Sequence, residues 1–164
     1  MSDTEPEKPS GSFADYMERD PHKTKSALPN MPQLASDSGD HGGAPKRLEL
    51  FADGVSIGWL GQDTDDWCVI ATEDSAVSLV PYVYGESIYY LREAGPYAQL
   101  EVSATYENVG FYNGDIPVAW GYDASTGILT SFYTSARLSY WSIDDGYIYA
   151  NGRSGYKPLT AFFR

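Results

Sequence analysis

The sequence predicts an all-β protein of about twelve short strands, arranged as three repeats and preceded by a disordered N-terminal arm. Three observations lead to this prediction. The second half of the chain contains an internal repeat, turn dipeptides recur between short apolar segments, and the composition changes near residue 46. Each observation bears on a different part of the chain.

The internal repeat relates residues 100–114 (LEVSATYENVGFYNG) to residues 138–152 (LSYWSIDDGYIYANG). Both segments contain a strand led by leucine, a turn, an aromatic strand and a closing Asn-Gly. A fixed period of about forty residues indicates one supersecondary unit that is copied around an axis. Leu100 and Leu138 are equivalent, as are Phe111 and Tyr149, and we expect these four side chains to point into the core. Because strand residues alternate between faces, Tyr112 should then face outward.

Flanking segments extend each copy to four strands, and a more diverged third block lies upstream. The blocks span residues 47–85, 86–125 and 126–164. Eight of the expected strands lie near 48–51, 56–60, 67–72, 77–83, 88–93, 117–122, 128–134 and 158–163. Each of the repeated segments 100–114 and 138–152 contributes two more strands.

The segments between strands carry residues that tolerate the positive φ of tight hairpins. Examples are Asp53-Gly54, Gly85-Glu86, Asp145-Gly146 and the two Asn-Gly pairs. After residue 46 no stretch has the 3.6-residue apolar period of a helix. We therefore expect essentially no helix in this part of the chain.

Three four-stranded units of about forty residues resemble the β-trefoil superfamily. The resemblance implies a barrel of six strands with three hairpins closing one end. Residues 88–100 (IYYLREAGPYAQL) are similar to the opening of fascin-like trefoils, whereas the Gln-x-Trp of ricin-type trefoil lectins is absent from the sequence. A β-sandwich or a short propeller fragment is the alternative architecture.

Residues 1–46 hold most of the prolines and almost no branched aliphatic residues, so we expect a disordered arm. Phe13, Tyr16 and Met17 nevertheless lie at helical spacing after Ser12, a possible N-cap. They could bind a partner or fold against the barrel. A transient helix in a tail is the favoured interpretation.

The net charge of the predicted domain disfavours partners that are themselves negatively charged. Residues 47–164 carry fifteen acidic and six basic side chains, a net charge of −9. Such a surface repels phosphate backbones and anionic headgroups, so we expect no nucleic-acid partner and no membrane insertion. Neutral or cationic ligands fit this charge better. The sequence has no apolar signal-peptide core and no segment of transmembrane length, which favours an intracellular, cytoplasmic location unless export is unconventional.

The predicted domain contains few of the residue types that most often act as nucleophiles or general bases, such as histidine and cysteine. Both histidines, His22 and His41, lie in the arm, and Cys68 is the single cysteine. We expect Cys68 to be a small buried hydrophobe and the domain to be neither an enzyme nor dependent on a metal or other cofactor. The carboxylates at positions 63, 65, 66, 144 and 145 fall in turns. A paired-carboxylate glycosidase and a calcium loop at residues 62–66 are the less favoured alternatives.

Aromatic residues are in surplus, with thirteen tyrosines and four tryptophans after residue 46. Tyrosine and tryptophan combine an apolar face with a polar group, which suits stacking on sugar rings. The candidate ligand-binding residues are aromatics at strand ends and polar neighbours in turns, namely Trp59, Trp67, Tyr112, Asn113, Asp115, Trp120, Trp141, Asp144, Asn151 and Tyr156. The candidate partner-binding residues are Phe13, Tyr16 and Met17.

Two functional hypotheses follow. The first is a non-enzymatic binding module for a neutral glycan, in the manner of a lectin. The second is a protein-interaction or scaffold module, including inhibition of a protease through exposed loops, in which the arm docks on a partner. Both rest on the expected fold and on the aromatic surplus.

Overall fold

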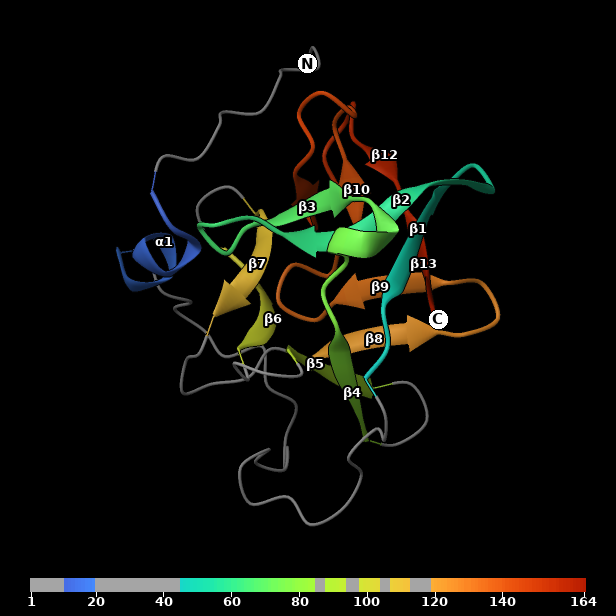
Figure 1. The fold of residues 1–164 in the computed structure, drawn as a ribbon, viewed down its shortest axis with the longest axis horizontal. Helices are drawn as coiled ribbons and strands as arrows, with labels where there is room; N and C mark the ends of the chain where they lie inside the picture. Colours follow the sequence, from blue (N-terminus) through green and yellow to red (C-terminus); the bar gives the residue numbers. More distant parts are fainter. Residues whose placement is uncertain (1–10, 20–44, 85–87, 94–97, 104–106, 113–118) are drawn as a thin grey trace.

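The computed structural model describes residues 11–19, 45–84, 88–93, 98–103, 107–112 and 119–164 (Figure 1). These residues form one short helix, one 3₁₀ turn and thirteen strands. In chain order they are α1 (Phe13–Arg19), β1 (Leu48–Ala52), β2 (Val55–Gln62), β3 (Cys68–Ala71), η1 (Glu73–Ser75), β4 (Leu79–Tyr84), β5 (Ile88–Glu93), β6 (Gln99–Val102), β7 (Val109–Tyr112), β8 (Trp120–Asp123), β9 (Ile128–Ser131), β10 (Ser139–Tyr140), β11 (Ile148–Tyr149), β12 (Lys157–Pro158) and β13 (Thr160–Phe163). The predicted all-β character is confirmed.

The strands form three antiparallel sheets, none of which closes into a barrel. The first has the order β13-β1-β2-β3, the second β11-β10-β12 and the third β7-β6-β5-β8-β9, with β4 also paired to β5. Two further contacts join the sheets. Lys46 and Leu79 exchange backbone hydrogen bonds of 2.8 and 2.7 Å, and the Ala161 amide donates to the Gly127 carbonyl at 2.8 Å.

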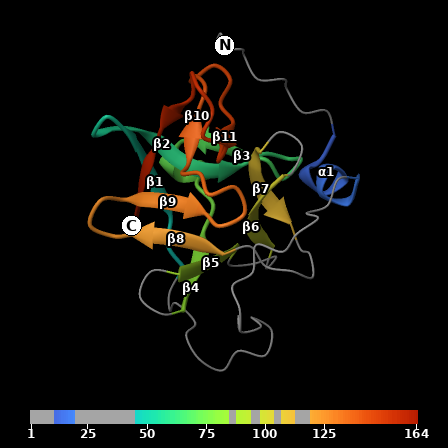
Figure 2. The same cartoon turned by 180° about the vertical axis from the view of Figure 1, so that it is seen from behind.

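Three hairpins meet on one side of the molecule. They are β2–β3, β6–β7 and β10–β11. Isolated bridges connect them in pairs, from Trp67 to Gly110, from Val69 to Tyr147 and from Asn108 to Tyr149. Each hairpin therefore touches the other two, although they are far apart in the sequence (Figures 1 and 2).

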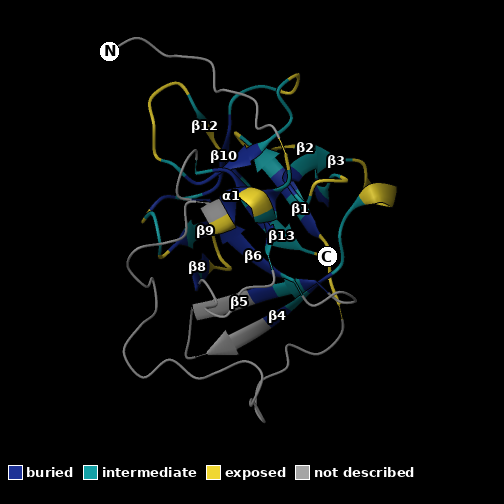
Figure 3. Cartoon of the chain, turned by 90° about the vertical axis from the view of Figure 1, so that its left-hand side faces the viewer, coloured by how far each residue is buried: buried dark blue, intermediate teal, exposed yellow. Residues whose placement is uncertain are grey.

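The main core lies between the sheets and is built from leucine, valine and aromatic side chains. Leu100, Leu138 and Tyr149 are fully buried and Phe111 is 1% exposed, as the repeat predicted. Tyr112, the neighbour of Phe111, is half-buried on the opposite face of its strand. The buried segments follow the strands through the centre of the molecule (Figure 3).

Helix α1 packs against β7 and against the loop before β3 (Figures 1 and 2). Its N-terminus is capped reciprocally, because the Asp15 amide donates to Ser12 Oγ at 3.1 Å and the Ser12 amide donates to Asp15 Oδ2 at 3.3 Å. The prediction that Ser12 is the N-cap of this helix is therefore confirmed. A seven-residue helix is marginal in water by itself, so packing must stabilise it.

That packing corrects the prediction of a disordered arm for residues 11–19. Phe13, Tyr16 and Met17 are 0%, 6% and 5% exposed, and they form a second small core with Trp67. The rings of Phe13 and Tyr16 meet the Trp67 ring edge to face at 5.1 and 5.0 Å between centroids. The three predicted partner-binding side chains therefore contact the chain's own β-sheet. The remainder of the predicted arm, residues 1–10 and 20–44, lies outside the described residues.

Candidate functional site

A cleft of about 220 Å³ opens among the last strands of the chain. Its walls come from the segment before β10, from β10 itself, from the loop that follows β11 and from β12. The lining residues are Arg137, Ser139, Asn151, Gly152, Arg153, Tyr156 and Pro158. Two of the predicted site residues, Asn151 and Tyr156, therefore lie in one cleft.

The Asn-Gly turn predicted from the repeat shapes one wall of the cleft. Asn151 Oδ1 accepts a hydrogen bond from the Arg153 amide at 3.1 Å, which tightens the loop after β11. Gly152 has φ +62°, a left-handed conformation that glycine adopts without steric cost. This turn brings the Arg153 side chain and the following Tyr156 to the cleft.

The aromatic wall consists of Tyr156 and the rings behind it. The half-buried Tyr156 ring packs edge to face on Trp141 at 5.2 Å and on Tyr149 at 5.0 Å between centroids. Tyr149 is itself anchored, because its hydroxyl donates to Asp145 Oδ2 at 3.0 Å. Burial raises the pKa of Tyr156, so its hydroxyl stays protonated at neutral pH and can both donate and accept hydrogen bonds.

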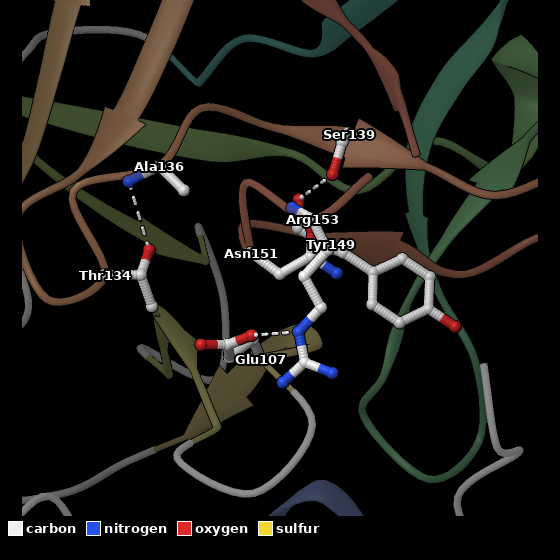
Figure 4. A network of polar contacts seen from close by, with 7 residues as sticks. All are labelled: Glu107, Thr134, Ala136, Ser139, Tyr149, Asn151 and Arg153. Atoms are coloured by element: carbon white, nitrogen blue, oxygen red, sulfur yellow. Dashed lines mark hydrogen bonds and ion pairs between the residues drawn. The ribbon is translucent and has the colours of Figure 1, made fainter. Parts of the chain in front are cut away.

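The polar wall is rich in hydrogen-bond donors (Figure 4). Arg153 Nε donates to Glu107 Oε1 at 3.0 Å, and Ser139 Oγ lies 3.5 Å from the Tyr149 carbonyl. Arg137 Nη2 donates to the Leu159 carbonyl at 3.2 Å. The Asn151 amide lies near the Tyr156 hydroxyl, but its Nδ2 atom has no hydrogen-bond partner.

This arrangement offers a ligand several hydrogen-bonding groups and one aromatic ring. The described lining residues supply two guanidinium groups, an amide, two hydroxyls and an aromatic ring, and they include no carboxylate, imidazole or thiol. A ligand in the cleft would meet a ring face on one side and polar hydrogens on the other.

The other predicted site residues are dispersed. Trp141 supports Tyr156 from behind, Asp144 is exposed in the turn between β10 and β11, and Trp59 is half-buried in the middle of β2. Tyr112 packs against the small core under α1. Asn113 and Asp115 lie outside the described residues.

Two predicted site residues are buried instead of exposed. Trp67 is 1% exposed beneath α1, and its Nε1 donates to the Gly11 carbonyl at 2.9 Å. Trp120 is fully buried, and its Nε1 donates to the Leu100 carbonyl at 3.0 Å. In both cases the polar indole nitrogen finds a backbone acceptor inside the fold, so these rings offer no surface to a ligand in this structure.

Sequence reasoning missed Arg137, Ser139 and Arg153. Basic residues are scarce after residue 46, so an arginine directly after the repeated Asn-Gly could have drawn attention to this loop. Arg137 and Ser139 flank Leu138, which the repeat assigned to the core. The other lining residues of the cleft lie about fifteen residues further along the chain, so no local sequence pattern predicts that the two segments come together.

A second, larger hollow of about 500 Å³ lies where β1 and β13 meet the β8–β9 turn. Phe51 and Phe162 pack edge to face there at 5.7 Å, and the Arg164 guanidinium lies 5.8 and 5.6 Å from their ring centroids. Arg164 is already paired with Glu49 at 3.1 Å. Because it has fewer uncommitted polar groups, this hollow is the weaker candidate site.

The acidic run at residues 62–66 has structural roles. Asp63 Oδ1 accepts hydrogen bonds from the amides of Asp65 and Trp67 at 2.9 and 3.0 Å, which forms the turn. Gln62 Nε2 donates to Asp66 and Glu93 at 2.9 and 2.7 Å. Among the residues that the structure describes, no group of three or more His, Cys, Asp or Glu side chains is placed to hold a metal ion.

Two more observations concern the described residues as a whole. Cys68 is fully buried, and burial raises the pKa of its thiol, so the predicted packing role is confirmed. Within the described ranges, α1 is far too short to cross a bilayer, and no other helix there could span one.

Comparison with known proteins gives no match to a family model, to a curated protein or to a solved structure.

Proposed function

We propose that this domain is a non-enzymatic binding module for carbohydrate, and that the cleft at Tyr156 is its binding site. The observation that carries the proposal is the meeting of one half-exposed aromatic ring with a wall of hydrogen-bond donors. A sugar presents C–H groups on its ring face and hydroxyls around its edge. An aromatic face and a few fixed polar groups are complementary to these two surfaces.

The size of the cleft supports a small ligand. Pockets for drug-sized molecules span roughly 300–1,000 Å³, whereas this cleft has about 220 Å³. One sugar unit fits such a space, with the rest of a glycan extending into solvent. The rigid backing of Tyr156 by Trp141 and Tyr149 reduces the entropy cost of holding the ring in place.

We also propose that the strands follow the β-trefoil arrangement. A six-stranded ring is formed if the contacts are followed in the order β1, β4, β5, β8, β9, β13 and back to β1. In this ring the contacts of β1 with β4 and of β9 with β13 depend on one backbone pairing each, at Lys46–Leu79 and at Gly127–Ala161. The hairpins β2–β3, β6–β7 and β10–β11 meet one another as the three capping hairpins of a trefoil would. These contacts support the resemblance seen in the repeats.

The alternative, in which the arm docks on a protein partner, has less support. Phe13, Tyr16 and Met17 would have to leave their own hydrophobic core before they could contact another protein. Exposing them would also expose Trp67. The carbohydrate proposal requires no such rearrangement.

A glycan array tests the proposed function. We expect the full chain to bind a subset of glycans, and we expect Tyr156→Ala to weaken that binding at least about tenfold, as for a central aromatic contact. Phe162→Ala is the matched control, because it removes an aromatic ring from the second hollow and leaves the cleft intact. An array that shows no binding, with and without calcium, would contradict the proposal.

A further inference from the structure

Arg137 is a half-buried arginine of the cleft with no carboxylate partner within the described residues, whereas Arg47 and Lys157, which also donate to backbone carbonyls, are exposed. Arg153 pairs with Glu107, and Arg164 pairs with Glu49. Arg137 instead donates one hydrogen bond, from Nη2 to the Leu159 carbonyl. Its Nε atom is buried without a partner, and Nη1 donates to no described residue.

An unpaired cation in a partly buried position is unfavourable. Desolvation of a charged group costs free energy unless an opposite charge or several hydrogen bonds compensate for it. Arg137 is half-buried in the wall of the cleft, and fifteen acidic side chains are available after residue 46. The fold nevertheless leaves this guanidinium without an acid to neutralise it.

Two carboxylates act electrostatically on Tyr156 of the cleft, and both are engaged by other groups. Glu107 is held by Arg153, and Asp145 accepts hydrogen bonds from the Tyr149 hydroxyl at 3.0 Å and from the Tyr147 amide at 3.3 Å. The cleft therefore contains one guanidinium without a paired carboxylate, and it contains donors that lack acceptors, Arg137 Nε and Asn151 Nδ2. A guanidinium binds a carboxylate through two parallel hydrogen bonds, a geometry that a neutral hydroxyl cannot match.

The net charge of the domain does not prevent an anion from binding here. The Debye length is about 8 Å at physiological ionic strength, so distant acidic side chains are screened. The groups within that distance decide the local potential. Glu107 offsets the charge of Arg153 there, so the positive charge of the lining that has no paired carboxylate is that of Arg137.

We propose that the cleft selects sugars that carry a carboxylate, the uronic-acid class, with Arg137 binding the carboxylate and Tyr156 contacting the sugar ring. This inference rests on the proposed function and narrows its ligand from neutral to acidic saccharides. The ring contact provides general affinity for a sugar, whereas the guanidinium provides the preference for the acid.

The test is a calorimetric titration of the full chain with methyl glycosides of glucuronic and galacturonic acid, of the matching neutral hexoses and of the uronate methyl esters. We expect each uronate to bind at least about tenfold more tightly than its neutral hexose. The methyl ester should bind like the neutral sugar, because it keeps the shape of the uronate and loses the charge. This comparison requires no change in the protein.

Protein variants assign the preference to one residue. We expect Arg137→Gln to bring the ratio of uronate affinity to neutral-sugar affinity down to about one. Arg137→Lys should keep only part of this preference, because an ammonium group does not present the two parallel N–H groups of a guanidinium. Arg47→Gln is the matched control, because Arg47 is exposed and donates to the Glu73 carbonyl outside the cleft.

The outcomes separate the two proposals. Equal binding of uronate, ester and neutral sugar would overturn the selectivity for acids and leave the carbohydrate site standing. Binding of neither sugar class would overturn both proposals. Acetate that binds as tightly as the uronates, with no effect of Tyr156→Ala, would also overturn the inference, because it would indicate a site for simple anions.

Discussion

Replacing Phe13 by alanine is expected to lower the free energy of unfolding by about 3–5 kcal/mol, the range for removal of a fully buried phenylalanine ring. Phe13 is 0% exposed, and its ring occupies the space where a side chain on Gly110 would begin. It also packs edge to face on Trp67, and its amide donates to the Asp65 carbonyl at 2.8 Å. The loss of this ring removes the main contact that keeps α1 on β7.

Urea unfolding monitored by tryptophan fluorescence measures this effect. Because Trp67 is covered by α1, the emission of the Phe13→Ala variant should also shift to longer wavelength before global unfolding begins. Glu18→Ala is the matched control in the same helix, since Glu18 is exposed. A change below about 1 kcal/mol in the Phe13 variant, with unchanged emission, would contradict the integral role of the helix.

Replacing Glu101 by glutamine is expected to stabilise the protein at neutral pH. Glu101 is 1% exposed, and burial raises the pKa of its carboxyl from 4.5 to about 8. It pairs across the strands with Gly110, the residue that Phe13 covers, so its charge would be buried near α1. The folded state therefore binds this proton more tightly than the unfolded state does.

The direction of the pH dependence follows from that difference. The stability linked to protonated Glu101 is fully present below pH 4.5 and is lost progressively as the pH rises to about 8. At pH 7 the loss amounts to roughly 3 kcal/mol, because each of the 2.5 pH units between the unfolded pKa of 4.5 and pH 7 costs about 1.36 kcal/mol. Glu101→Gln should recover most of it, and the advantage of the variant should vanish near pH 4.

Unfolding in urea at pH 4, 6 and 8 tests this expectation for the wild type and the variant. Glu73→Gln is the matched control, because it makes the same substitution at an exposed position in η1. A stability difference that is the same at all three pH values would indicate that Glu101 is not protonated in the folded state at neutral pH.

The strands were predictable because local signals specify them. Alternating apolar residues and turn dipeptides such as Asp53-Gly54 indicate where each strand begins and ends, and the repeat identified Leu100 and Leu138 as core residues. These features depend on residues within one hairpin. A single sequence carries enough information at that range to predict them.

The docking of α1 was not predictable in the same way. The burial of Phe13 depends on the absence of a side chain at Gly110 and on the ring of Trp67, which are both distant in the sequence. The composition of the first 46 residues indicated a disordered arm, and only three side chains overcome that tendency in residues 11–19. Tertiary packing decides the structure of this short helix, and local propensity does not.

The candidate site was predicted in part, for a related reason. Asn151 and Tyr156 follow a repeated turn and could be named from the sequence, whereas Trp67 and Trp120 have the same aromatic character and are buried. Position beside a turn does not tell whether an indole ring faces solvent or a backbone carbonyl inside the fold. Arg137 became a candidate only when its lack of an acidic partner was visible.

The most direct test of the proposed binding site is a two-dimensional ¹H–¹⁵N NMR titration of the full chain with a methyl uronoside. The account predicts saturable shifts in the amides of Arg137, Ser139 and residues 151–157, which surround the cleft. The amides of Phe51 and Phe162 in the second hollow should stay unchanged. Shifts confined to the second hollow, or no saturable shifts at millimolar sugar, would contradict the assignment of the binding site.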